Sequence, residues 1–181
     1  MMSNGAEHRA VVNRFGLAIR LSKRSRGLLN AYRTLAPDRA KWFGKRSFDH
    51  DNAEPILLGL SMELALKAWW VFDFDKRNPP RTHDLEKLFA ALCEDSKVQL
   101  REAYARDVLP RNPHAWSPTF RLDDFIAYNK DAFVNWRYSH EKENVNMVVS
   151  EFEDTLDMML SEFEKRYVEL ETRPQKIISD G

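Results

Sequence analysis

The stretch AEPILLGLSMELALKAWWVFDF, residues 53–74, decides the fold class of this chain. From Ile56 to Phe72 it is apolar on every side of a helix except at Ser61, Glu63 and Lys67. A helix that is apolar all round is normally buried by other elements instead of lying on a surface. The stretch therefore predicts a central helix that other helices surround.

The rest of the chain continues the helical pattern on both sides of this stretch. Apolar residues recur at helical spacing almost everywhere, and no pair of strand-like runs with hairpin turns occurs. Besides 53–74, the predicted helices span about residues 6–34, 83–94, 96–109, 121–143 and 144–170. We expect an all-α fold, a single-domain up-and-down bundle of about five to six helices over residues 1–171, with a flexible tail at 172–181.

Composition and missing motifs exclude several classes of protein. The single cysteine, Cys93, allows no disulfide framework and no cysteine-rich metal site. The sequence also lacks H-E-x-x-H, P-loop, G-x-G-x-x-G and G-x-S-x-G motifs, so we predict no metal and no cofactor. No uninterrupted apolar run approaches the roughly 18 residues of a membrane span, and the N-terminus has no apolar signal region. We therefore expect a soluble cytoplasmic protein without a membrane partner.

Charges are segregated along the chain although they balance overall, with 28 basic and 28 acidic residues. Residues 1–50 hold eleven Lys and Arg against three acids, whereas residues 141–181 hold eleven acids against five bases. A basic first helix could follow a phosphate backbone, with Arg20 and Arg24 as RNA-binding residues. Alternatively, the basic and acidic helices are neighbours or simply present solvated faces.

Glu63 and Lys67 are two charges on a helix that otherwise reads as buried. They are four residues apart, in the orientation that favours an ion pair on a helix. Burying either charge alone would cost several kcal/mol, so the two should pair or face a shared polar pocket. Both interpretations stay open: a pair that fixes helix register, or the lining of a pocket.

A second polar cluster lies in FVNWRYSHEKE, residues 133–143. Arg137 and His140 are three residues apart and so share one helical face, with Glu141 beside them and Phe133 and Trp136 as apolar walls. A histidine that moves protons next to an arginine that stabilises phosphate charge suits metal-independent phosphodiester cleavage. The alternative is a surface or dimer-interface helix, in which Arg137 pairs with an acid.

His83 follows Thr82, a predicted N-cap, at the start of the helix expected over 83–94. The histidine could support a pocket, or the pair His83 and Asp84 could serve mainly to cap and dock this helix.

The last predicted helix has apolar residues at alternating steps of four and three, typical of a helix-packing seam. The seam could face a long antiparallel helix of the same chain or a second copy of the protein. For a homodimer, we predict that Phe152 and Phe163 lie in the interface.

Several of these features together resemble the HEPN superfamily of small all-helical domains. They are an amphipathic first helix, LGLSMELALKAWWVF (58–72), THDLEKLF (82–89), and a late helix with an arginine and a histidine before a long final helix. The resemblance covers roughly residues 6–170. The family includes metal-independent ribonucleases of toxin and antiviral systems, usually dimers with the site at their interface, and non-catalytic members that bind nucleotides or partners.

The arginine and histidine of this chain depart from the family's catalytic spacing. The family has four to six residues between the two, whereas only Tyr138 and Ser139 separate Arg137 from His140. The stretch from Arg77 to His83 has a matching spacing, but it lies on a proline-broken turn between early helices, and we interpret that match as chance.

The resemblance and the residues lead to three hypotheses. The first is a HEPN-like metal-independent ribonuclease, or a ribonuclease-derived toxin or defence protein. Its catalytic residues would be Arg137 and His140, and the residues that support its pocket would be Glu63, Lys67, His83 and Glu141. The second is a non-catalytic helical homodimer that binds a partner protein, such as an antitoxin, or a nucleotide. The third is RNA binding through the basic first helix without cleavage.

Overall fold

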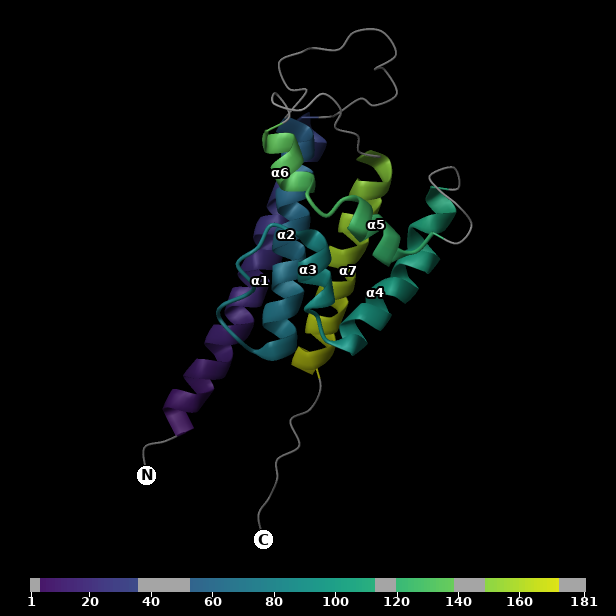
Figure 1. Ribbon diagram of the computed structural model, residues 1–181. Coiled ribbons are helices and arrows are strands. Elements are labelled where there is room, and N and C mark those ends of the chain that lie inside the picture. The colour runs from purple at the N-terminus through teal and green to yellow at the C-terminus, as the bar shows by residue number, and fades with distance from the viewer. Residues whose placement is uncertain (1–3, 36–52, 113–119, 139–148, 173–181) are drawn as a thin grey trace, which may run out of the picture.

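The structure is a computed structural model that describes residues 4–35, 53–112, 120–138 and 149–172, and the side chains from Gly16 to Tyr167 within them. These residues form an all-α bundle, which confirms the predicted fold class (Figure 1). The described elements are α1 (Asn4–Leu35), α2 (Ala53–Phe74), α3 (Leu85–Ala90), α4 (Glu94–Asp107), the 3-10 helix η2 (Leu109–Arg111), α5 (Leu122–Tyr128), α6 (Ala132–Arg137) and α7 (Val149–Thr172). Apart from Thr172, the predicted tail lies outside the described residues.

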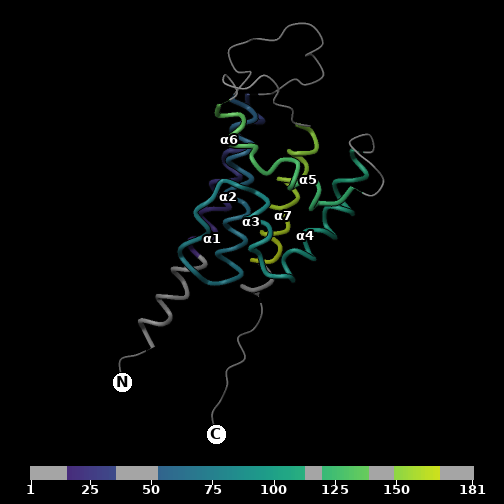
Figure 2. Tube along the Cα trace, in the orientation of Figure 1, coloured from purple at the N-terminus to yellow at the C-terminus, as the bar shows by residue number. Residues whose placement is uncertain are grey.

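α2 is the central helix, as its sequence predicts. It contacts α1, α3, α6 and α7, and Figure 2 shows the long helices α1, α2 and α7 side by side. Trp69 is fully buried, and its indole N–H donates to the carbonyl of Met159 on α7 at 3.1 Å. Removing ~200 Å² of tryptophan surface from water is worth about 5 kcal/mol. Trp69 therefore ties the central helix α2 to α7.

The apolar character of α2 also makes it long and apolar enough to cross a membrane by composition alone. However, 61% of its most apolar window is buried inside the bundle. This burial is typical of the core helix of a soluble protein.

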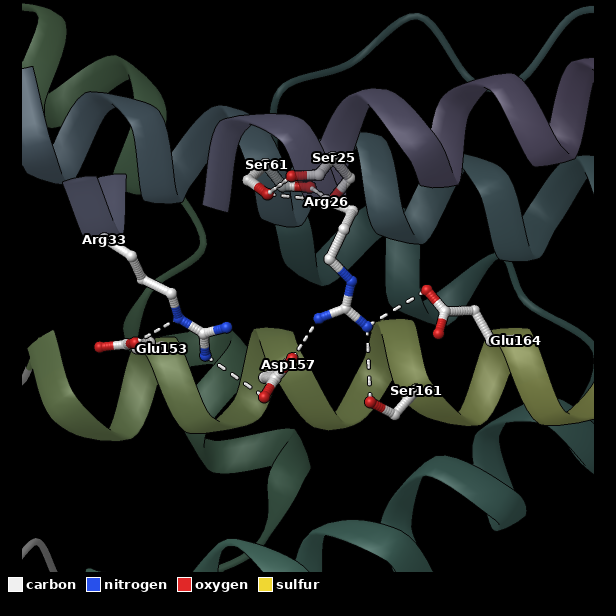
Figure 3. Close-up of polar contacts among 8 residues, drawn as sticks. All are labelled: Ser25, Arg26, Arg33, Ser61, Glu153, Asp157, Ser161 and Glu164. Carbon is white, nitrogen blue, oxygen red and sulfur yellow. Dashed lines mark hydrogen bonds and ion pairs between the residues drawn. The ribbon is translucent and has the colours of Figure 1, made fainter. Parts of the chain in front are cut away.

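Two serines fix the packing of α1 on α2. Each hydroxyl of Ser25 and Ser61 donates to the carbonyl oxygen of the other residue at 2.7 Å, and both side chains are fully buried (Figure 3). Small side chains allow the two backbones to approach closely, and the reciprocal bonds satisfy polar groups that would otherwise be costly to bury. Ser61, the polar exception on this side of α2, is thus explained by its partner on α1.

Ion pairs join the basic α1 to the acidic α7. Arg26 pairs with Asp157 and Glu164, and Arg33 pairs with Glu153 at 2.8 Å and with Asp157 at 3.3 Å (Figure 3). Burial alone would raise the pKa of Asp157, but hydrogen bonds and charge from the two arginines outweigh it and hold that pKa below its usual value. Part of the charge segregation in the sequence therefore reflects two helices that are neighbours.

The single helix predicted over 121–143 is divided in the structure. α5 ends at Tyr128 and α6 begins at Ala132, because the Asn129 side chain donates to the carbonyl of Phe125 at 2.9 Å and caps the first helix. The break leaves the carbonyl of Lys130 free to accept the N–H of Leu85 at 2.9 Å, which ties this turn to the start of α3. The division also separates α6 from α5 as a short helix that packs on α2.

The helix predicted over 83–94 is shorter than expected and starts later. Asp84, not Thr82, is the N-cap of α3, and its carboxylate accepts the N–H of Lys87 at 3.0 Å. The hydroxyl of Thr82 instead accepts the N–H of Asp84 at 3.1 Å. His83 therefore lies in a bonded turn before the helix and not inside it.

Phe152 and Phe163 were predicted to lie in a dimer interface, but the structure buries both inside the single chain. They are only 0% and 2% exposed within the single chain, where Phe152 packs against Phe125 and Phe163 against Trp69. The alternating apolar seam of the last helix is therefore an intramolecular one, with α2 as a neighbour.

A buried carboxylate, Asp73, holds the other end of the bundle together. It accepts the N–H of Cys93 at 3.0 Å, the hydroxyl of Ser96 at 2.6 Å and a guanidinium N–H of Arg166 at 3.2 Å. Cys93 is the N-cap residue of α4 and is partly exposed. Asp73 thus joins α2, α4 and α7.

Candidate functional site

The candidate site is built around Glu63, a buried carboxylate halfway along α2. Only 4% of its side chain is exposed, and its Oε1 lies 2.6 Å from the Nζ of Lys67, one helical turn further on. Lys67 is itself 15% exposed. The two charges pair as the sequence predicts, which is how a charged group can be kept inside an apolar helix face.

The second oxygen of Glu63 holds His83. The Nδ1 of His83 lies 2.8 Å from Oε2 of Glu63, although the two residues are twenty positions apart. The rest of the imidazole faces outward, since 56% of the side chain is exposed. The ring of Phe133 on α6 lies against it, with 5.3 Å between centroids. An accessible imidazole is therefore held on one side by a buried carboxylate and on another by an aromatic ring.

This arrangement sets the proton positions of a neutral His83. A carboxylate only accepts hydrogen bonds, so the proton of a neutral ring lies on Nδ1 and the lone pair lies on Nε2. A histidine fixed by a carboxylate in this way can take a proton at Nε2 and stabilise the charge it acquires. Because the Glu63 side chain is only 4% exposed and each oxygen already has a partner, the carboxylate acts on His83 instead of binding a ligand itself.

The contact between α6 and α2 places Phe133 against the histidine. A Cβ added at Gly59 would lie only 2.8 Å from the backbone nitrogen of Phe133, so the two helices touch here through backbone atoms. Gly59 lies one turn before Glu63 on α2. The glycine therefore brings α6 to the same face of α2 that carries the carboxylate.

Arg137 is the last residue of α6, one turn after Phe133, and its side chain is exposed. Its guanidinium lies over the ring of Tyr138, 5.4 Å from the centroid. Among the described residues, no carboxylate pairs with it. A guanidinium that is not already neutralised can bind an anion.

The structure thus brings together Glu63, Lys67 and His83, three of the residues predicted to support a pocket. His140 and Glu141 lie outside the described residues. The contribution of Phe133 to holding His83 was not expected, and the signal for it in the sequence was the glycine inside the otherwise bulky α2.

The predicted RNA-binding residues Arg20 and Arg24 lie elsewhere. Both are exposed on α1, which packs on α2 at Ser61. Glu63 is two positions further along α2, a rotation of about 200° around the helix axis. The basic face of α1 and the histidine are therefore on opposite sides of α2.

Two cavities occur elsewhere in the described part of the chain, and their charges are largely paired internally. One of about 230 Å³ is lined by Phe89, Lys97 and Arg101 among others, and Arg101 binds Asp123 at 2.8 Å. The other, of about 120 Å³, lies between the end of α4 and α7, and four acids and two bases line it. Within the described ranges, no group of three or more His, Cys, Asp or Glu side chains is placed to hold a metal ion.

Comparisons with protein-family models, with curated proteins and with solved structures found no match to this chain. The resemblance to the HEPN superfamily therefore stays a prediction from the sequence.

Proposed function

We propose that this protein is a HEPN-like ribonuclease that cleaves RNA without a metal ion, with His83 as a proton-transfer residue. The observation that carries the proposal is the exposed imidazole of His83 bound at Nδ1 by the buried Glu63. This geometry leaves Nε2 available to a substrate hydroxyl, and a correctly placed general base contributes typically 10²–10⁴-fold to a rate.

The reaction that suits these groups uses the RNA's own 2′-hydroxyl. Nε2 of His83 takes the 2′-hydroxyl proton, and the 2′-oxygen attacks the neighbouring phosphorus. The bond from phosphorus to the 5′-oxygen breaks, and that oxygen receives a proton from a protonated histidine. The products are a 2′,3′-cyclic phosphate and a 5′-hydroxyl end.

Three residues of the FVNWRYSHEKE stretch complete this proposal. Arg137 would bind the phosphate oxygens and stabilise their charge as the bond breaks. His140, three residues later in the sequence, would in its protonated form donate a proton to the leaving oxygen, and Glu141 would support it. Lys67 has a different role, because its ammonium is bound to Glu63 and pairs with the charge of that carboxylate in the apolar helix face.

The biological setting of the proposal comes from the sequence resemblance. It comprises a toxin or defence role in the cytoplasm, a homodimer, and a partner protein such as an antitoxin. If a homodimer forms, its interface must use surfaces other than Phe152 and Phe163, which are buried in the chain.

The test is cleavage of a fluorescently labelled single-stranded RNA in excess EDTA. We expect cleavage by the wild-type protein and none of the matching DNA, which lacks the 2′-hydroxyl. His83→Ala, Arg137→Ala and His140→Ala should each reduce the rate, whereas Arg111→Ala, a change at another exposed arginine, should not. Equal rates for wild type and His83→Ala, with the fold intact by circular dichroism, would remove His83 from the mechanism.

A second function, non-catalytic binding of a nucleotide or partner protein, is favoured by one observation. Both oxygens of Glu63 are satisfied, so the cluster is stable as a structural tie between α2 and the loop before α3. In that case the wild-type protein binds its ligand but leaves RNA intact in the same assay.

A further inference from the structure

We propose that the loop between α2 and α3 binds the phosphate backbone of the RNA through Lys76, Arg77 and Arg81, here called the loop cations. The inference rests on the proposed function and names the residues that would guide single-stranded RNA to His83. The segment DKRNPPRT, residues 75–82, carries three basic residues and one acid. All three loop cations are exposed.

The loop cations differ from nine other basic residues of the described chain, each of which is paired with a nearby carboxylate. The paired ones are Arg26, Arg33, Lys67, Lys87, Lys97, Arg101, Arg106, Lys165 and Arg166. Among the described residues, none of the loop cations has such a partner. Exposed cations that bind no carboxylate of the described chain favour the binding of an external polyanion.

The path of the loop leads these charges to the histidine. His83 contacts Glu63, which lies eleven residues before the end of α2 at Phe74, a distance of about 16 Å along the helix axis. The nine residues 75–83 must therefore run back beside α2, as Figure 1 shows. Two residues of chain span at most about 7 Å, so the Cα of Arg81 lies within that distance of the Cα of His83.

The loop is also well fixed for a connecting segment. Pro79 and Pro80 restrict the backbone, and both are partly buried. The N–H of Asp84 binds the Thr82 hydroxyl at 3.1 Å, next to the tie between His83 and Glu63. Charges held on a fixed backbone lose less conformational freedom on binding, which favours affinity.

The chain supplies a matched control on α1. Arg20, Lys23 and Arg24 are also three exposed basic residues with no carboxylate partner among the described residues. They lie on the helix that covers the opposite side of α2 from Glu63. Replacing either set by alanine removes the same three charges, so the two triple variants differ only in where the charge is lost.

The experiment measures binding of a fluorescein-labelled single-stranded RNA by anisotropy over a series of salt concentrations. We use His83→Ala as the background for all proteins, so that binding is measured without cleavage. Three lost phosphate contacts should flatten the slope of log K against log salt by about 2, and weaken binding about 100-fold at ~0.1 M salt. We expect this for the variant K76A/R77A/R81A. R20A/K23A/R24A should show little change, whereas a matching loss in that variant would favour the alternative hypothesis that RNA binds through Arg20 and Arg24 on the first helix.

Several results would overturn the proposal. They are an equal loss of RNA affinity in both triple variants, a loss of affinity in the α1 variant alone, and unchanged affinity in the loop variant. Absence of any RNA binding would also overturn it, including the case in which the loop binds an acidic protein instead. Unfolding midpoints in urea establish that both variants keep the fold. If RNA binds through the loop but wild-type protein does not cleave it, the binding proposal stands and the ribonuclease proposal fails.

Discussion

Replacing Gly59 with alanine tests the contact on which the geometry of the site depends. The new Cβ would lie 2.8 Å from the Phe133 nitrogen and 2.9 Å from its Cα, both backbone atoms that cannot rotate away. Ordinary contact begins at 3.4 Å, so α6 must withdraw by about 0.6 Å, the difference between 3.4 and 2.8. Overpacking of this kind costs about 1–3 kcal/mol.

Gly27→Ala provides the matched control, because alanine also changes the helix propensity. Gly27 lies inside α1 with nothing within 4 Å of an added Cβ, so this variant should gain the whole propensity term of about 1 kcal/mol. Subtracting the two effects cancels that term and leaves the steric cost at Gly59. The two free energies of unfolding should therefore differ by about 1–3 kcal/mol.

Urea denaturation followed by tryptophan fluorescence measures this difference. With a slope of about 2 kcal/mol per molar urea, the midpoints of the two variants should differ by about 0.5–1.5 M. Gly59→Ala should also slow RNA cleavage, since displacement of α6 moves Phe133 away from the ring of His83. If Gly59→Ala raises the midpoint as much as Gly27→Ala does, α6 does not touch α2 at this position and the reasoning is refuted.

Three further predictions concern stability in the same urea assay. Glu63→Ala leaves the ammonium of Lys67 without its partner and should lower the free energy of unfolding by about 3 kcal/mol. The double variant Glu63→Leu/Lys67→Met removes both charges and should lower it by less. Equal losses of stability in the two variants would mean that Glu63→Ala leaves no unpaired charge behind. Because the pKa of Asp157 is depressed in the folded state, its stabilisation is present above the unfolded pKa and is lost as pH falls through the folded one. Asp157→Asn should therefore cost about 0.5–1 kcal/mol at pH 7, with the deficit shrinking below about pH 4, and a deficit that is constant with pH would contradict this. Phe152→Glu buries a carboxylate and should unfold the chain by circular dichroism; a folded monomer released from a dimer would instead restore the interface prediction.

The central helix could be predicted because a helix that is buried on all sides has apolar residues around its whole circumference, which the sequence shows directly. The three polar exceptions in α2 also carried information, since each one finds a partner: Ser61 with Ser25, and Glu63 with Lys67 and His83. The pairing of Glu63 with Lys67 was visible in the sequence because both lie one turn apart on the same helix.

Contacts between distant segments could not be predicted in the same way. The break after Asn129 depends partly on a bond from Leu85 to Lys130, and helical periodicity contains no signal for a partner 45 residues away. Likewise, the apolar pattern that includes Phe152 and Phe163 is the same whether the helix packs against another helix of its own chain or against a second copy of the protein. His83 was identified as a candidate, but only the fold shows that Glu63 holds it.

The most direct test of the account is a double-mutant cycle on RNA cleavage in EDTA with Glu63→Gln, His83→Ala and the double variant. If Glu63 acts by holding His83, the loss in the double variant should equal that of His83→Ala alone, because residues that act as a unit are non-additive. Losses that multiply in the double variant, or a wild-type protein that leaves the RNA intact, would contradict the account.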